Sequence, residues 1–536
     1  MQQEPPSPSS SVPPQTSDPS LRTMDHKIRR ASWLLMASVL LSRLIGFLRE
    51  MILARTVGAS SMTDVYYASF TLPDFLNYLM AAGALSISFI PMLSEYIAKN
   101  DEATGKLVFR SLTTVLGTVL FVLIVIAEFF ARDLSRWIAP GFNPQQLETL
   151  TQLTRIILPA QWFIFWGGLA TAIQHTHGRF FLPAMSPIVY NAGIIICGIG
   201  LHERYGVAGF SVGVLVGAVF SHGLLPWWGI RSLGYGVAPY FHFSQEIRAA
   251  LHRYLWLTLP IMLGFSVVVT DEWISKYFAS QLEEKAISWL SYARTEMRIP
   301  LAVIGQAAGI ASFPYLSRLW SKADYPSYAR TLLREIAKLW AAAPIAGVLL
   351  MVHALPITHA IYGGSRFTFS DLEATAEALQ FFGVGMVFWT LQTVLARGFY
   401  AAQRTWLPSL VGTVLSLVMI PLYQYLAKRH GHVGLAASGS IAIAIYSVVL
   451  WGLLVVHMKK VAPEISFANF YCFAFRWSFV VVAMYAIASG LFALGIYQKT
   501  QISAIADVVV TTAVLGGVSL VLLRTTFQRW TDGPLF

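Results

Sequence analysis

Long apolar stretches recur along the chain from about residue 31 to about residue 523, separated by short polar segments. Most approach the roughly 20 residues that a helix needs to cross a bilayer. They lack the strict alternation of apolar and polar positions that β-barrel strands require, so the pattern predicts helices. We expect an all-α polytopic membrane protein of about fourteen transmembrane helices. The predicted helices cover residues 31–57, 63–98, 107–131, 151–175, 183–201, 206–229, 250–278, 286–317, 334–356, 376–401, 407–427, 432–457, 472–497 and 503–523, with the second and eighth long enough to be bent.

Composition supports a protein that folds in lipid. Hydrophobic residues make up 56% of the 536 residues and charged residues only 12%, whereas soluble domains carry about 25% charged residues. The chain has no GxxxxGK[ST] loop, which excludes a nucleotide-driven motor of that type. Cys197 and Cys472 lie in apolar runs, so we interpret them as packing residues rather than as a disulfide or a metal site.

The distribution of basic residues predicts the orientation. The formal net charge is +11, and with the N-terminus inside, most lysines and arginines fall in cytoplasmic segments, as the positive-inside rule requires. This distribution makes nucleic-acid binding unnecessary as an explanation of the charge. Residues 1–30 are expected to form a disordered cytoplasmic tail, since residues 1–25 are rich in Pro, Ser and Gln. An even number of helices also places the C-terminus in the cytoplasm.

Three short motifs occur twice at nearly one spacing. Pro91-Met-Leu-Ser corresponds to Pro314-Tyr-Leu-Ser, Ala81-Ala-Gly to Ala307-Ala-Gly, and Arg179-Phe-Phe-Leu-Pro to Arg404-Thr-Trp-Leu-Pro, with offsets of 223 to 226 residues. The offset covers six predicted helices, so the two copies share one orientation in the membrane. Parallel repeats of this kind are a transporter architecture with the substrate site between the halves.

The repeat divides the chain into four segments. These are the tail 1–30, an N-lobe of six helices over 31–230, a C-lobe of six helices over 231–460, and helices thirteen and fourteen with a short cytoplasmic tail over 461–536.

Charged residues inside apolar runs are the candidate functional groups. Arg43 and Arg49 lie in the first predicted helix, with Glu50 directly after Arg49. A charge at mid-bilayer costs about 2.5–3.5 kcal/mol, so it usually faces a wet cavity. The two arginines could therefore bind an anionic ligand. The alternative is that Arg49 and Glu50 sit near the helix end and reach the interface.

Asp64 is predicted near the start of the second helix. It could cap that helix, because an acidic side chain is favourable near a helix N-terminus. It could equally be the charge partner of an arginine in a gate.

Two further charged groups lie in the second repeat. Arg294 and Arg298 are four residues apart in the eighth helix and share a face, while Glu296 points elsewhere. With Arg43 and Arg49 they would form a cationic site, because arginine suits phosphate oxygens. The alternative is a structural cluster in which acids on neighbouring helices pair with these arginines.

The seventh helix holds Asp271, Glu272 and Lys276. Glu272 and Lys276 have the spacing of an internal ion pair. A cation or proton site is the alternative. No nucleophile–base constellation stands out in the chain, so we expect a transporter and not an enzyme, with no cofactor or metal.

Several motifs resemble the MurJ (MviN) family of lipid II flippases. They include Ser42-Arg-Leu-Ile-Gly-Phe-Leu-Arg-Glu50, Thr63-Asp64, Phe89-Ile-Pro91, the segment from Arg179 to Asn191, and Gly398-Phe-Tyr400. The resemblance extends over nearly the whole chain after residue 30.

The resemblance implies the fold of the superfamily that also contains multidrug and polysaccharide exporters. It implies that the chain flips an undecaprenyl-diphosphate-linked peptidoglycan precursor to the outer leaflet of a bacterial inner membrane. The basic cavity would hold the diphosphate, and helices thirteen and fourteen would guide the lipid tail. Arg43, Arg49 and Asp64 match positions considered functional in the family.

The chain departs from the family pattern at four positions. Asn77 and Tyr78 stand where the family often has two basic residues, and Ala82 where it often has an acid. The family's arginine in the eighth helix falls on Thr295, with Arg294 beside it and Arg298 added. Clear matches to the family's sodium ligands are missing in the eleventh helix, where Tyr423 occupies a polar position.

We therefore expect a lipid II flippase that works by alternating access and is reset by the membrane potential or a coupled cation. A flippase for another polyprenyl-diphosphate saccharide is the first alternative, and a MATE-like exporter, which needs an acidic cavity, is the second. A transport-inactive scaffold of the wall-building machinery is a third. The expected partners are the lipid-linked saccharide, membrane lipids and cell-wall synthesis proteins.

Overall fold

The computed structural model describes residue 38 and residues 41–81, 89–241, 244–263, 267–364 and 366–493. Helices dominate these residues, and the β-bridge between Gly364 and Phe367 is isolated. The all-α class is confirmed. Among the described residues, eight helical stretches are long and apolar enough to cross a membrane. The count of fourteen stays a prediction, because the predicted helix 503–523 and most of residues 31–40, at the start of the first predicted helix, lie outside the described residues. The predicted tail 1–30 lies outside them as well.

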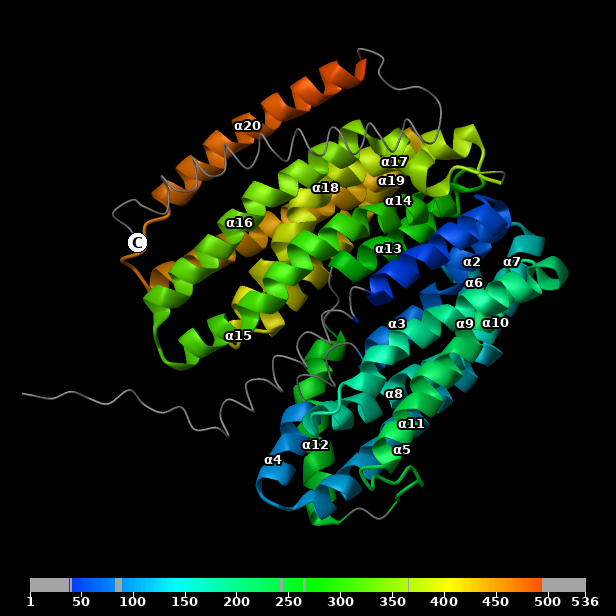
Figure 1. Ribbon diagram of the computed structural model, residues 1–536, viewed down its shortest axis with the longest axis vertical. Coiled ribbons are helices and arrows are strands. Elements are labelled where there is room, and N and C mark those ends of the chain that lie inside the picture. Colours follow the sequence, from blue (N-terminus) through cyan, green and yellow to red (C-terminus); the bar gives the residue numbers. More distant parts are fainter. Residues whose placement is uncertain are drawn as a thin grey trace, which may run out of the picture.

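The N-lobe helices form one group, drawn from blue to green in Figure 1. A helix covers 41–56. The following elements are α2 (Ser61–Ser69), α3 (Thr71–Ala81), α4 (Ile90–Ala98), α5 (Glu102–Phe129), α6 (Ala131–Ile138), α7 (Pro144–Ile157), α8 (Ala160–Thr176), α9 (Phe181–Tyr205), α10 (Ala208–Ala218), the π-helix η2 (Val219–Leu224) and α11 (Leu225–Arg231).

The C-lobe helices form the second group, and α20 lies along its outer side against α16 (Figure 1). Of the elements assigned to this lobe, α12 (Gln245–Leu263) lies beside the first group in Figure 1. The others are α13 (Val267–Ala279), α14 (Ala286–Leu301), the π-helix η3 (Ala302–Gln306), α15 (Ala307–Ser321), α16 (Tyr325–Val352), α17 (Ala354–Tyr362), α18 (Phe369–Ala401), α19 (Trp406–Val461) and α20 (Ala468–Ala493). Element α19 covers two predicted helices, which meet at Gly431, where the backbone is non-helical.

Matched helix boundaries confirm the internal repeat. The helices α5 and α16 both have 28 residues, and their N-caps Asp101 and Asp324 lie 223 residues apart. Each cap side chain accepts a hydrogen bond from the backbone N–H three residues later. The helices α7 and α18 both begin with a capping box, at Asn143 and Thr368.

The turns between helices repeat as well. Gly178 and Gln403, 225 residues apart, both have positive φ, and the residue after each donates a backbone hydrogen bond five residues back, which closes the preceding helix. Gly206 and Gly431 share φ values of 56° and 58°. The same local chemistry therefore ends corresponding helices in both lobes.

The predicted second and eighth helices are broken. The second divides at Phe70, where α2 ends and α3 begins. The eighth contains Pro300 and continues as η3 before α15. Proline removes one backbone hydrogen bond, and π-helical turns mark irregularities inside helices.

The boundary at residue 231 separates the lobes less cleanly than the repeat predicts. The helix α12 was assigned to the C-lobe, but it packs against α5 and α3 of the N-lobe. Tyr254 is buried in the N-lobe core, and Arg253 donates to both carboxylate oxygens of Glu95 on α4 at 2.8 Å. These contacts hold the first part of the seventh predicted helix to the other lobe.

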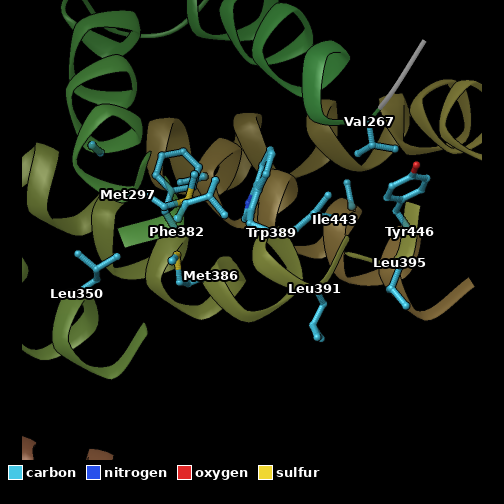
Figure 2. Close-up of a cluster of buried hydrophobic side chains, with 14 of the residues drawn as sticks. Val267, Met297, Leu350, Phe382, Met386, Trp389, Leu391, Leu395, Ile443 and Tyr446 are labelled. Atoms are coloured by element: carbon cyan, nitrogen blue, oxygen red, sulfur yellow. The ribbon is translucent and has the colours of Figure 1, made fainter. Parts of the chain in front are cut away.

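The C-lobe core brings together side chains from several helices. Figure 2 shows Phe382, Met386 and Trp389 of α18 beside Met297 of α14 and Ile443 of α19. Lipid tails are as apolar as leucine, so close packing, and not exclusion from water, holds such helices together.

Close packing in the N-lobe depends on glycines in α9 and α10. A Cβ at Gly193 would lie 2.6 Å from the Cα atom of Gly217, and one at Gly213 would lie 2.7 Å from the Cα atom of Ile194. Real side chains do not tolerate such distances, so the two backbones touch because neither carries a Cβ there.

Substitution of Gly193 should therefore destabilise the protein. We expect Gly193→Ala to lower stability by about 1–3 kcal/mol, the usual effect of overpacking, measured as a lower Tm in detergent. Gly200→Ala in the same helix is the matched control, since a Cβ at Gly200 meets no heavy atom within 4 Å in the described structure. Equal Tm values for both variants would contradict the packing argument.

Candidate functional site

A polar cavity of about 140 Å³ lies between the two lobes. The N-lobe contributes the helix 41–56, α2 and α3, and the C-lobe contributes α13 and α14. The lining residues are Arg49, Glu50, Tyr66, Tyr67, Phe70, Asp74, Glu272, Lys276, Ser291, Arg294, Thr295 and Arg298. The structure thus brings together six of the nine residues singled out in the sequence: Arg49, Glu50, Glu272, Lys276, Arg294 and Arg298.

Arg49 is held on the N-lobe wall by two polar neighbours. Its guanidinium binds Glu50 Oε1, with Nε at 3.1 Å, and Nη1 donates to Asn191 Oδ1 at 3.1 Å. Glu50 also accepts a hydrogen bond from the Tyr67 hydroxyl at 2.6 Å. Arg49 therefore faces the cavity, as one interpretation of the sequence predicted, while remaining paired with Glu50.

Arg294 is locked within the C-lobe. Its Nη1 pairs with Asp271 Oδ2, and its guanidinium lies 4.9 Å from the centre of the Phe382 ring. The Tyr423 hydroxyl donates to the other oxygen of Asp271 at 2.5 Å. Both charged side chains are almost completely buried. This arrangement matches the structural alternative for Arg294.

A second charge cluster lies beside the first. Lys276 Nζ is 3.1 Å from Glu272 Oε1, one helical turn along α13. Arg298 of α14 donates from Nη2 to Glu272 Oε2 at 2.6 Å. The two predicted groups, arginines of the eighth helix and charges of the seventh, therefore form one network.

The cavity is mixed in charge and not simply cationic. Four cationic side chains and three carboxylates line it, and Asp271 lies buried behind Arg294. The expected arginines are present, and acids from the same helix or from neighbouring helices accompany them. A buried charge needs such a partner in a medium of low dielectric constant.

Besides Asp271, which lies behind Arg294, two predicted residues do not line the cavity. Arg43 lies on the helix 41–56, about two turns before Arg49, and its side chain is exposed. Asp64 is buried at one end of the lobe interface and caps α14, not its own helix. The cap of α2 is Ser60.

The contacts of Asp64 join the lobes. Its Oδ2 accepts from the backbone N–H of Lys285 and its Oδ1 from that of Ser288, both at 2.7 Å, and the Ser288 hydroxyl also binds Oδ1. No arginine or lysine side chain pairs with Asp64 among the described ion pairs. The partner of Asp64 across the lobe interface is therefore the start of α14 and not the arginine that the sequence offered as one alternative. The sequence could not reveal this partner, which lies 221 residues away.

Close backbone approaches surround the Asp64 contact. A Cβ at Gly58 would lie 2.3 Å from the carbonyl oxygen of Arg366, and one at Gly141 would lie 2.1 Å from that of Ser280. Loops of both lobes therefore meet at this end of the lobe interface. We call Asp64, Lys285 and Ser288 the latch.

Sequence reasoning missed Asp74 and Asn191 as site residues. Asp74 follows Pro73 at the start of α3 and lines the cavity. An acid in the first turn of a helix is favourable there whatever its surroundings, so nothing in the sequence indicated that Asp74 lies at the lobe interface. Asn191 belongs to a motif shared with the family, and this was the available signal.

The departures from the family pattern have structural counterparts. Asn77 points into the N-lobe, where its amide donates to Gln161 Oε1 at 3.0 Å. Tyr78 packs edge-on against Trp273 of α13. Thr295 lines the cavity on the face that it shares with Arg298. Ala82 lies outside the described residues.

An apolar groove of about 480 Å³ lies against α20. It is bounded by α16, α18, α19 and α20, and Trp340, Trp451, Phe470 and Phe475 contribute aromatic surface. Polar atoms are sparse in it, so it suits a hydrocarbon chain. No cluster of His, Cys, Asp and Glu in the described residues could hold a metal ion.

Comparisons with known proteins agree with this arrangement. A family model described as lipid II flippase MurJ matches residues 53–533. The chain is 30% identical over 421 residues to a lipid II flippase MurJ of Burkholderia cenocepacia, covering 77% of this chain and 81% of the relative. It is 28% identical to a probable lipid II flippase MurJ of Vibrio cholerae, with 80% and 83% covered.

Solved structures show the same fold. A lipid II flippase MurJ in an inward closed conformation superposes with a TM-score of 0.72 at 21% identity, covering 92% of this chain and 99% of that one. An inward-facing MATE family multidrug transporter gives a TM-score of 0.64 at 12% identity, with 79% and 96% covered. With a family model matching nearly all of the chain after residue 52, this multi-pass membrane protein belongs to the MurJ family of lipid II flippases.

Proposed function

We propose that this protein moves a lipid-linked anionic saccharide of the lipid II type across a bacterial inner membrane by alternating access. The observation that carries the proposal is a cavity at the lobe interface that holds arginines from both lobes, while the latch joins the lobes at one end of that interface. Arginine binds phosphate oxygens with two parallel hydrogen bonds, which suits a diphosphate linking lipid to sugar.

The groove against α20 supplies the second part of such a site. A polyprenyl chain needs apolar surface along the membrane while its diphosphate occupies the polar cavity. The aromatic lining of the groove meets that need. Helices thirteen and fourteen would then keep the lipid tail in the bilayer as the headgroup crosses.

A flippase for a different polyprenyl-diphosphate saccharide is the second candidate. It is favoured by Asn77, Tyr78 and Thr295, which leave the cavity without basic groups that the family often has there. The MATE-like alternative is supported only by fold, since the cavity is not the acidic one that a cation exporter needs.

Orientation and driving force complete the proposal. The basic loops support cytoplasmic termini, which puts the latch on the outer side. The membrane potential is the favoured driving force, because Asp271 and Glu272 already pair with cations of the chain itself. A coupled cation at these acids would have to displace an internal one. Contacts with cell-wall synthesis proteins belong to the same proposal.

Rescue of a flippase-depleted host tests the function. We expect the wild-type protein to restore growth and export of lipid II, and Arg49→Ala to fail because it removes the N-lobe cation from the cavity. Arg132→Ala, which removes an exposed arginine from α6, is the matched control and should rescue. Arg43→Ala tests the prediction for that residue in the same assay. Wild-type protein that reaches the membrane without rescuing would argue against lipid II as the substrate.

Removal of the latch should favour separation of the lobes at this end of the interface. We expect Asp64→Asn to weaken closure by about 1–2 kcal/mol, the usual effect of losing a helix cap, and to shift the population toward the open form. In a background with Cys197→Ser and Cys472→Ser, Ser291→Cys places a thiol on the cavity wall. Labelling of that thiol from outside by a membrane-impermeant maleimide should become faster.

Asp133→Asn on α6 is the matched control, since it removes an exposed acid. It should leave the labelling rate unchanged. An unchanged rate in Asp64→Asn would show that the latch does not govern closure.

A further inference from the structure

Glu272 binds two cations through different oxygen atoms. Lys276 Nζ lies 3.1 Å from Oε1, and Arg298 Nη2 lies 2.6 Å from Oε2. One negative charge is therefore shared by two positive charges. Arg294, in contrast, shares Asp271 with no second cation among the described ion pairs.

The two cations on Glu272 differ in their freedom to leave. The side chain of Lys276 is 6% exposed, and it reaches Glu272 within its own helix. The side chain of Arg298 is 53% exposed and faces the cavity from α14. Arg294 is only 5% exposed and also contacts Phe382.

Removing one member of a buried ion pair normally leaves an unpaired charge, which is strongly unfavourable. If Arg298 leaves Glu272, the Glu272–Lys276 pair remains. If Arg294 leaves Asp271, that carboxylate retains only the Tyr423 hydroxyl. Of the two α14 arginines, Arg298 is thus the one that can be released at little cost.

An anionic headgroup requires such a release. Each of the four cations that line the cavity is already paired with a carboxylate of the chain, so a diphosphate competes with these resident acids. Asp74 faces this space from the N-lobe wall. A resident cation that exchanges its carboxylate for phosphate oxygens gives the diphosphate a charge-assisted hydrogen bond.

We propose that Arg298 moves from Glu272 to the phosphate oxygens of the headgroup, while Lys276 keeps Glu272 paired. This inference rests on the proposed function and deepens it, because it assigns a binding role to Arg298 and a positioning role to Glu272 and Lys276. Arg294 takes no part in the exchange and holds α14 to α13.

Binding to the purified full-length protein in nanodiscs tests the exchange. The probe is undecaprenyl diphosphate, with undecaprenol as the uncharged control. We expect Arg298→Ala to weaken binding about tenfold, the effect of one hydrogen bond to a charged group. Lys276→Met should weaken binding about threefold, which is roughly half of the binding free energy lost in Arg298→Ala. The reason is that Arg298 becomes the sole partner of Glu272 and is harder to release.

The decisive comparison uses a Glu272→Gln background. There Arg298 is already free, so adding Lys276→Met should leave affinity unchanged. The double variant removes an acid and a base together, which keeps the buried charge balanced if Lys276→Met alone fails to fold. Equal weakening by Lys276→Met in both backgrounds, or wild-type affinity in Arg298→Ala, would overturn the exchange.

Two further arms separate this inference from the function. Wild-type protein that prefers undecaprenol, or binds both lipids equally, would overturn the proposed function itself. Inorganic pyrophosphate should bind more weakly than the lipid and lose affinity in Arg298→Ala. Pyrophosphate binding as tight as that of the lipid would overturn the assignment of the site to a lipid headgroup.

Discussion

A charged group within the bilayer needs a partner, and this constraint explains how the lobe interface is built. Removing one member of a buried pair costs about 3–5 kcal/mol, so the buried Arg294 of α14 lies against an acid, Asp271. The more exposed Arg298 shares Glu272 with Lys276. The pairing lets the chain carry several charges through the membrane region. It also means that an anionic substrate competes with resident carboxylates and does not enter a vacant positive site.

The elements that sequence could predict are those determined locally. Apolar runs predict the helices, and the paired caps Asp101 and Asp324 show why two distant segments fold alike. The contact between Glu272 and Lys276 was predictable because both lie on one helix, one turn apart. Local features of this kind need no knowledge of how helices are arranged.

Features that depend on the rotation and docking of helices were not predictable. The repeat assigned α12 to the C-lobe, yet Arg253 and Tyr254 attach it to the N-lobe. Asn77 turns away from the cavity to Gln161, although the family pattern places charge at that position. Two of the three groups that bind Asp64 are backbone N–H groups, which carry no residue-specific signal in any sequence.

The latch has a consequence for how the closed form can be left. Asp64 binds backbone N–H groups at the start of α14, and N–H groups in the first turn of a helix have no acceptor within that helix. When the lobes separate, water can bind both the carboxylate and these N–H groups, so opening exchanges hydrogen bonds and does not abandon them. Water therefore takes part in the opening step. The closed form can be stable while the barrier to opening stays low.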